Sequence, residues 1–180
     1  MSEVLYEFNP TSHITIGAVG QPGRRIFFLQ ASQGERLISL KLEKEQVLAL
    51  ARAIETILEE LEQRELRPVS SLEEPSGDAL ALRQPVEPAF VAGQMALAFD
   101  QASGLLVLVV QEAAETGVAE GPPLQAARFW AGLGQMRALS RVAREVAGQG
   151  RPICPLCGNP IDPGGHFCPR GNGHDQAPTA

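Results

Sequence analysis

The sequence predicts an α+β protein of two related halves, each an antiparallel sheet followed by a helix, with a C-terminal zinc knuckle. Three observations predict this fold class. Alternating apolar and polar residues indicate strands in residues 13–42 and again in residues 90–110. An amphipathic helical pattern follows each of these strand regions. Cysteine and histidine residues then cluster near the end of the chain.

The first half, residues 1–66, is predicted to be a βββα unit. Three segments have the alternation or the β-branched and aromatic content that is typical of strands: residues 13–16, 24–30 and 37–42. Pro22 and Gly23 suit the centre of a type II turn between the first two, because proline presets φ and glycine accepts a positive φ. This spacing predicts three antiparallel strands joined by short turns.

The helix of the first half is predicted over residues 43–65. Its apolar residues recur every three or four positions and form one stripe: Val47, Leu50, Ala51, Ile54, Ile57, Leu58 and Leu61. Glu43 and Glu45 lie in the first turn, where negative charge complements the helix dipole. Residues 67–88 lose this periodicity and contain four prolines, so we expect a linker that crosses the surface.

The second half, residues 89–150, is predicted to be a ββ(β)α unit. Residues 90–99 and 105–110 read as strands, and the polar stretch 112–121 leaves room for a third. A helix is expected to begin at Pro122-Pro123, since proline is tolerated in a first helical turn, and to end near Gly148. Its expected inward residues are Ala126, Phe129, Trp130, Leu133, Met136, Val142, Ala143 and Val146.

Composition narrows the class of protein. The 180 residues are 44% hydrophobic, which is enough for a core and excludes wholesale disorder or a fibrous repeat. No run approaches the roughly 18 apolar residues that span a bilayer, so we expect no membrane insertion. The net charge of -6 argues against a general nucleic-acid binder, which must neutralise phosphates. Clustered cysteines without an export signal indicate reduced thiols and a cytoplasmic protein.

The C-terminal segment, residues 151–180, carries the most informative motif. Cys154 and Cys157 are separated by two residues and followed by a glycine, a spacing that lets two thiolates converge in a zinc knuckle. His166 and Cys168 are separated by one residue, so in an extended segment their side chains point to the same side. We therefore predict one tetrahedral zinc ion bound by these four side chains.

Two alternatives to this ligand set stay open on spacing alone. His174 is a rival fourth ligand, because the five residues between it and Cys168 also allow the site to close. A redox Cys-x-x-Cys pair is the other alternative, although such a motif opens a helix, whereas Pro152 and Pro155 place this one in a loop. A closed four-ligand site is structural, and its metal would supply folding free energy of order 10 kcal/mol to a short, glycine-rich tail.

No motif predicts catalysis or cofactor binding. Gly17, Gly20 and Gly23 precede Arg24 and Arg25, but the segment lacks the Gly-Lys-Ser/Thr ending of a phosphate-binding loop and leads into a strand. No Ser/His/Asp pattern is visible, and acidic residues gather only on the solvated face of the first helix. We therefore expect neither catalytic nor cofactor-binding residues.

Several motifs together resemble one bacterial family. They lie at residues 19–31, at residues 42–47, at residues 93–98, and in the tail, where Cys154-Pro-x-Cys-Gly is followed by Cys168-Pro-Arg. The family is the domain-of-unknown-function group numbered 3090, found mainly in actinobacteria. The resemblance implies a zinc-knuckle tail without an established activity. A tyrosine usually stands at the position of His174 in that family, which favours His166 as the fourth ligand.

The predicted function is non-catalytic. We expect a zinc-containing interaction or scaffold protein whose tail orders a docking surface for a protein partner. One alternative is an enzyme or enzyme subunit that acts on a phosphorylated or nucleotide-like small molecule, using Arg24, Arg25 and a cleft between the halves. A second alternative is a weak nucleic-acid contact through the knuckle, because Arg151 and Arg170 flank its ligands.

Overall fold

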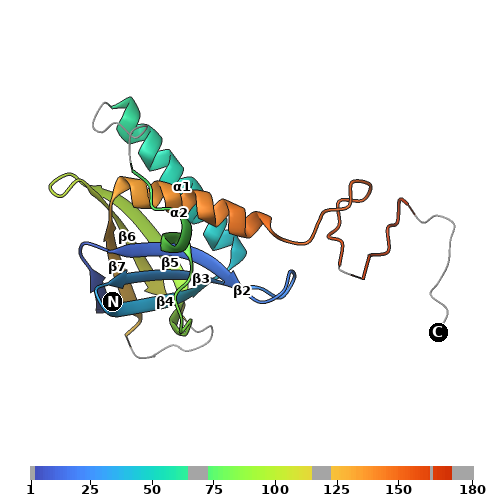
Figure 1. The fold of residues 1–180 in the computed structure, drawn as a ribbon, viewed down its shortest axis with the longest axis horizontal. Coiled ribbons are helices and arrows are strands. Elements are labelled where there is room, and N and C mark those ends of the chain that lie inside the picture. Colours follow the sequence, from blue (N-terminus) through green and yellow to red (C-terminus); the bar gives the residue numbers. More distant parts are fainter. Residues whose placement is uncertain (1–2, 65–72, 115–122, 163, 172–180) are drawn as a thin grey trace.

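One mixed seven-stranded sheet and two long helices make up the fold (Figure 1), which confirms the predicted α+β class. The computed structural model describes residues 3–64, 73–114, 123–162 and 164–171. The strands lie in the order β1 (Glu3–Phe8), β7 (Gln125–Ala131), β6 (Leu105–Glu112), β5 (Pro88–Asp100), β4 (Arg36–Leu42), β3 (Ile26–Gln33) and β2 (His13–Val19). No helix within these ranges has the length and apolar character needed to cross a membrane.

Residues 13–63 follow their prediction closely. β2, β3 and β4 are an antiparallel meander in which Ile16, Leu29 and Leu40 lie side by side on the buried face. The helix α1 (Lys44–Gln63) begins two residues after β4. Its buried residues are those of the predicted stripe, with the exception of Ile57, which is only partly buried.

The second half corrects the prediction of where its helix starts. Residues 125–131 are the strand β7, and α2 (Leu133–Gly148) begins only after Gly132. In β7, Ala127, Phe129 and Ala131 face the core in a two-residue period. A short run of apolar residues fits a helical or a strand period equally well. Here the residues form a strand because they pair with β6 and β1.

Neighbouring strands within each predicted half are antiparallel, but two pairings between the halves, which the sequence analysis did not predict, are parallel. β1 pairs with β7 in parallel, and β4 pairs with β5 in parallel, so all seven strands join in one sheet. The sequence analysis did not assign β1, because Glu3 and Glu7 interrupt its pattern and its partner lies far along the chain. β1 nevertheless contributes Phe8, whose buried ring lies 5.5 Å from that of Phe129.

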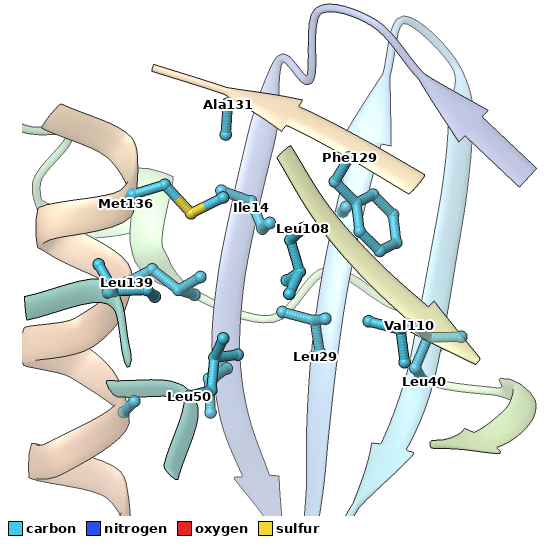
Figure 2. Packing of buried hydrophobic residues seen from close by; sticks show 14 of the residues in the cluster. Ile14, Leu29, Leu40, Leu50, Leu108, Val110, Phe129, Ala131, Met136 and Leu139 are labelled. Carbon is cyan, nitrogen blue, oxygen red and sulfur yellow. The ribbon is translucent and has the colours of Figure 1, made fainter. Parts of the chain in front are cut away.

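The hydrophobic core lies between one face of the sheet and the two helices (Figure 2). Leu29 and Leu108 reach it from the strands, while Met136 and Leu139 reach it from α2, and all four are fully buried. The two helices also pack against each other. A hydrogen-bonded ion pair from Arg144 to Glu55 links them and lowers the pKa of that carboxyl.

A glutamine at the start of α1 ties this helix to the second half. The side-chain oxygen of Gln46 accepts a 2.8 Å hydrogen bond from the N–H of Glu43 and so caps the helix. Its side-chain nitrogen donates to the carbonyls of Ala92 and Gly93 in β5, both at 2.9 Å.

The start of α2 has the same arrangement. The Gln135 side-chain oxygen accepts a 2.8 Å hydrogen bond from the N–H of Gly132. Its nitrogen donates to the carbonyls of Thr11 and Ser12, just before β2, both at 3.2 Å. Each long helix is therefore capped by a glutamine that also binds the chain at or beside the first antiparallel strand of the other half.

The described residues between α1 and β5, from residue 73 onward, cross the outer face of β2 and β3. They contain the short helix η1 (Gly77–Leu80). The Thr15 hydroxyl donates to the carbonyl of Leu80 at 2.6 Å. The Gln30 amide donates to the carbonyl of Arg83 at 2.8 Å and accepts from its N–H at 2.7 Å. These bonds fix the linker to the sheet.

Replacing Gln30 should therefore destabilise the protein. Gln30→Leu keeps the side-chain volume but leaves the N–H and carbonyl of Arg83 without this partner, which should lower the free energy of unfolding by about 2 kcal/mol. The matched control is Gln33→Leu in the same strand, because that amide donates only to an exposed carbonyl, that of Asn9. Urea unfolding measures both. Equal losses in the two variants would show that the linker contact does not stabilise the fold.

His13 is buried beneath this linker. It is only 4% exposed, and neither ring nitrogen has a hydrogen-bond partner of standard geometry. Burial lowers its pKa, and the positive charge of Arg83 lowers it further, against a smaller opposing effect of the Ala81 and Ala79 backbone. The native state therefore resists protonation of this ring.

The stability of the protein should consequently fall in mild acid. At pH values below about 6.5, the pKa of histidine in the unfolded chain, the unfolded state binds a proton at His13. The native state binds this proton less readily, so the free energy of unfolding falls as the pH decreases. In His13→Gln this contribution is absent and the loss between about pH 7.5 and pH 5.5 should be smaller. Urea unfolding at the two pH values measures it. The other histidines are common to both proteins, and identical pH dependence would contradict the account.

Candidate metal centre

The first pair of cysteines lies in a closed turn of the tail, which leaves the end of α2 and extends away from the sheet (Figure 1). The N–H of Cys154 donates to the carbonyl of Asn159 at 2.8 Å, and the N–H of Gly158 donates to the carbonyl of Cys154 at 2.9 Å. Gly158 has φ +74°, a conformation that side-chain-bearing residues rarely adopt. The Cys-x-x-Cys-Gly spacing therefore folds back on itself, with both thiols inside the turn.

The second pair of candidate ligands follows another tight turn. The N–H of Gly165 donates to the carbonyl of Asp162 at 2.8 Å. His166 and Cys168 come directly afterwards, and the N–H of Gly171 then donates to the carbonyl of Cys168 at 3.2 Å. Two turns thus bring two short segments of the tail against each other.

The structure brings Cys154, Cys157, His166 and Cys168 together. One ligand atom from each lies within 4.8 Å of all the others. The Sγ atoms of Cys154 and Cys168 are 3.8 Å apart, and Sγ of Cys157 is 3.3 Å from Nε2 of His166. A tetrahedral site with metal–sulfur bonds of about 2.3 Å and metal–nitrogen bonds of about 2.0 Å separates its ligand atoms by about 3.5 to 3.8 Å. The group could therefore hold a metal ion.

The thiols of this group differ in acidity. Hydrogen bonds from the N–H groups of Cys157 and then Leu156 lower the pKa of Cys154 to about 6. The N–H of Asn159 lowers the pKa of Cys157, but burial and the neighbouring Cys154 and Cys168 outweigh it, so that pKa is raised. The thiolate is the form that binds a metal. With this lowered pKa, Cys154 is largely in the thiolate form at neutral pH.

Three further residues that the sequence analysis placed near this site, His174, Arg151 and Arg170, are not among the four that converge. His174, the rival fourth ligand, lies outside the described residues. Arg151 forms a 2.6 Å ion pair with Asp162, and Arg170 donates to the carbonyl of Leu156 at 3.3 Å. Both arginines that could have contacted a nucleic acid therefore have partners within the tail.

Arg24 and Arg25 lie in the turn between β2 and β3, because β3 begins at Ile26 and not at residue 24 as predicted. The N–H of Arg24 donates to the carbonyl of Gln21 at 2.9 Å, and Gly23 has φ +90°. The side chain of Arg25 lines a cavity beside the tail, together with Lys44. Sequence reasoning missed Lys44, because the neighbours of this lysine come from distant parts of the chain and no local pattern identifies them.

Comparison with protein-family models covers nearly the whole chain. Residues 6–168 match the model described as "Protein of unknown function (DUF3090)". The chain belongs to the DUF3090 family. The match confirms the family resemblance, and the matched residues include all four candidate ligands. No curated protein and no solved structure matches the chain.

The two candidate histidines can be separated by mutation. His166→Ala removes an atom that lies within the cluster, so it should weaken metal binding by more than about 100-fold, whereas His174→Ala should leave it unchanged. A competition titration against a chromogenic chelator measures both affinities. Retention of tight binding by the His166 variant together with its loss in the His174 variant would contradict the ligand set.

Proposed function

We propose that the tail binds one zinc ion through Cys154, Cys157, His166 and Cys168, and that this ion is structural. Three thiolates and one imidazole are a ligand set that selects zinc over harder ions. Four protein ligands leave no open position for water or a substrate. This argues against hydrolysis or Lewis-acid chemistry at the ion.

Burial supports the structural role. Among the described residues of the tail from Gly150 to Gly171, the only buried ones are Cys154 and Cys168. This segment therefore has no apolar core of its own, and metal ligation takes the place of one. Such modules fold when the metal binds, because the binding free energy is also the folding free energy.

We further propose that the zinc tail is a docking surface for another protein. Its large apolar side chains lie exposed beside the ligands: Ile153 is 60% exposed, Leu156 55% and Phe167 76%. Ile153 precedes Cys154, and Phe167 stands between the last two ligands. This exposure carries the proposal, because apolar side chains held in water next to a rigid anchor are typical of surfaces that a partner covers. The protein is then a zinc-containing interaction or scaffold protein.

The remainder of the chain is proposed to be the platform that carries this tail. We infer that residues 1–66 and 89–150 are two related sheet-and-helix units joined by the linker 67–88, and that β1 is an additional strand of the first unit. The order of three strands and a helix occurs twice, as β2–β4 with α1 and as β5–β7 with α2. The glutamine caps Gln46 and Gln135, each bound to the opposite half, support the relationship.

Capture from a lysate of the native host tests the docking surface. The double variant Leu156→Ser with Phe167→Ser should lose the partner that the wild-type chain retains, since both substitutions remove exposed apolar area from the tail. The matched control is Val91→Ser, which changes an exposed apolar residue of β5 that is 42% exposed. Mass spectrometry identifies the captured protein, and binding is then repeated with the purified partner.

Metal content separates a lost surface from a lost fold. All three proteins should contain one zinc ion per chain, because neither set of substitutions touches a ligand. Equal recovery of every captured protein by the wild type and the tail variant would contradict a docking role for the tail.

A further inference from the structure

A cavity of about 240 Å³ lies where the sheet and helices meet the start of the tail. Three separate parts of the chain line it: the end of the β2–β3 turn, the first residue of α1, and the chain that leaves α2. Its principal lining residues are Gly23, Arg25, Lys44, Gly150, Arg151 and Ile153. This cavity is separate from the four metal ligands, none of which lines it.

The charged residues that line the cavity all carry positive charge. They are Arg25, Lys44 and Arg151, and no carboxylate among the residues that the structure describes lines the cavity, although the whole chain has a net charge of -6. Arg151 is paired with Asp162. Within the ranges that the structure describes, Arg25 and Lys44 form no ion pair. Two cations without an ion pair, one of them stacked over the ring of Phe27, thus lie close to a third on an acidic protein.

Two of these cations converge on the same point. A Cβ atom placed on Gly150 would lie 3.5 Å from Nζ of Lys44 and 3.9 Å from Nη2 of Arg25. On the other wall, a Cβ atom placed on Gly23 would lie 3.1 Å from Nε of Arg151. The two glycines leave space beside the cationic groups. Like charges this close repel each other, so a bound anion would stabilise the arrangement.

We propose that the cavity binds a small organic phosphate, a phosphomonoester. A phosphomonoester carries a charge of about -1.5 to -2 at neutral pH and offers three acceptor oxygens, which match a converging pair of arginine and lysine side chains. Phe27 and the exposed Ile153 line the same cavity and provide apolar contact for the carbon part of the ligand. The proposal depends on this cavity and goes beyond the docking role of the tail.

Binding at this place would also connect the two parts of the molecule. Arg25 and Lys44 belong to the sheet-and-helix platform, whereas Arg151 belongs to the tail. A phosphate held by all three fixes the direction in which the tail leaves α2. The ligand therefore orients the tail without contacting the metal site.

Substitution of Gly150 provides a sharp test. The residue does not have a positive φ, and its side chain would point at Lys44 and Arg25. Gly150→Asp places a carboxylate beside both cations and should compete with the ligand, which lowers its affinity at least about tenfold. Gly150→Asn has the same shape without the charge, and its affinity should stay within about threefold of the wild type.

The probe is phenyl phosphate, titrated into the zinc-loaded full chain and followed by two-dimensional amide NMR. Saturable shifts should appear around Gly23 to Phe27, Lys44 and Gly150 to Ile153, and binding should be tighter than for inorganic phosphate. Arg25→Ala and Lys44→Ala should each weaken binding about tenfold, while Lys41→Ala in β4, which does not line the cavity, should not. Zinc content, measured in every variant, should stay at one ion per chain.

Three results would overturn the proposal. The first is the absence of saturable binding of phenyl phosphate up to about 10 mM, which corresponds to an affinity too weak for a built site. The second is equal affinity in the Gly150→Asp and Gly150→Asn variants. The third is equal binding of phenyl phosphate and inorganic phosphate, because the apolar wall would then contribute nothing. None of these results bears on partner capture by the tail, so the two proposals fail separately.

Discussion

The fold depends on one sheet face that needs two helices to cover it. Leu29 of β3 and Leu108 of β6 lie on opposite sides of the joint between the halves, and both are completely buried in the same core. Three strands and one helix bury too little apolar surface to be stable alone, so the elements on the two sides of this joint gain stability from sharing one core. The reciprocal glutamine caps, Gln46 and Gln135, add specific hydrogen bonds across the same joint.

The tail is not stabilised by a hydrophobic core as the sheet and helices are. It begins at the end of α2, its described residues add nothing to the core cluster, and Ile153, Leu156 and Phe167 are exposed to water. Its order comes from two short turns and from four side chains that converge on one point. A part of the chain organised in this way can present side chains to a partner without changes in the platform. The cationic cavity lies at the connection between the two, where Gly150 leaves room beside Lys44 and Arg25.

Local patterns predicted those elements whose signal is local. The apolar stripe of α1, the turn at Pro22-Gly23 and the convergence of the three cysteines with a histidine could be inferred from spacing along the sequence, which left His166 and His174 as alternatives. Residues 125–131 could not, because Phe129 and Trp130 fit a helical or a strand period and only pairing with two neighbouring strands decides between them. β1 and the position of Lys44 depend on contacts with distant parts of the chain, which no window of sequence contains.

Hydrogen exchange of the full chain, with zinc bound and after removal by a chelator, tests the central claim that the metal organises the tail on an independent platform. The claim predicts that amides hydrogen-bonded within the tail, such as those of Cys154, Gly158 and Gly165, lose protection when the metal is removed. Amides of the paired strands β2 to β7 should exchange at unchanged rates. Loss of protection throughout the sheet, or unchanged protection in the tail, would contradict the account.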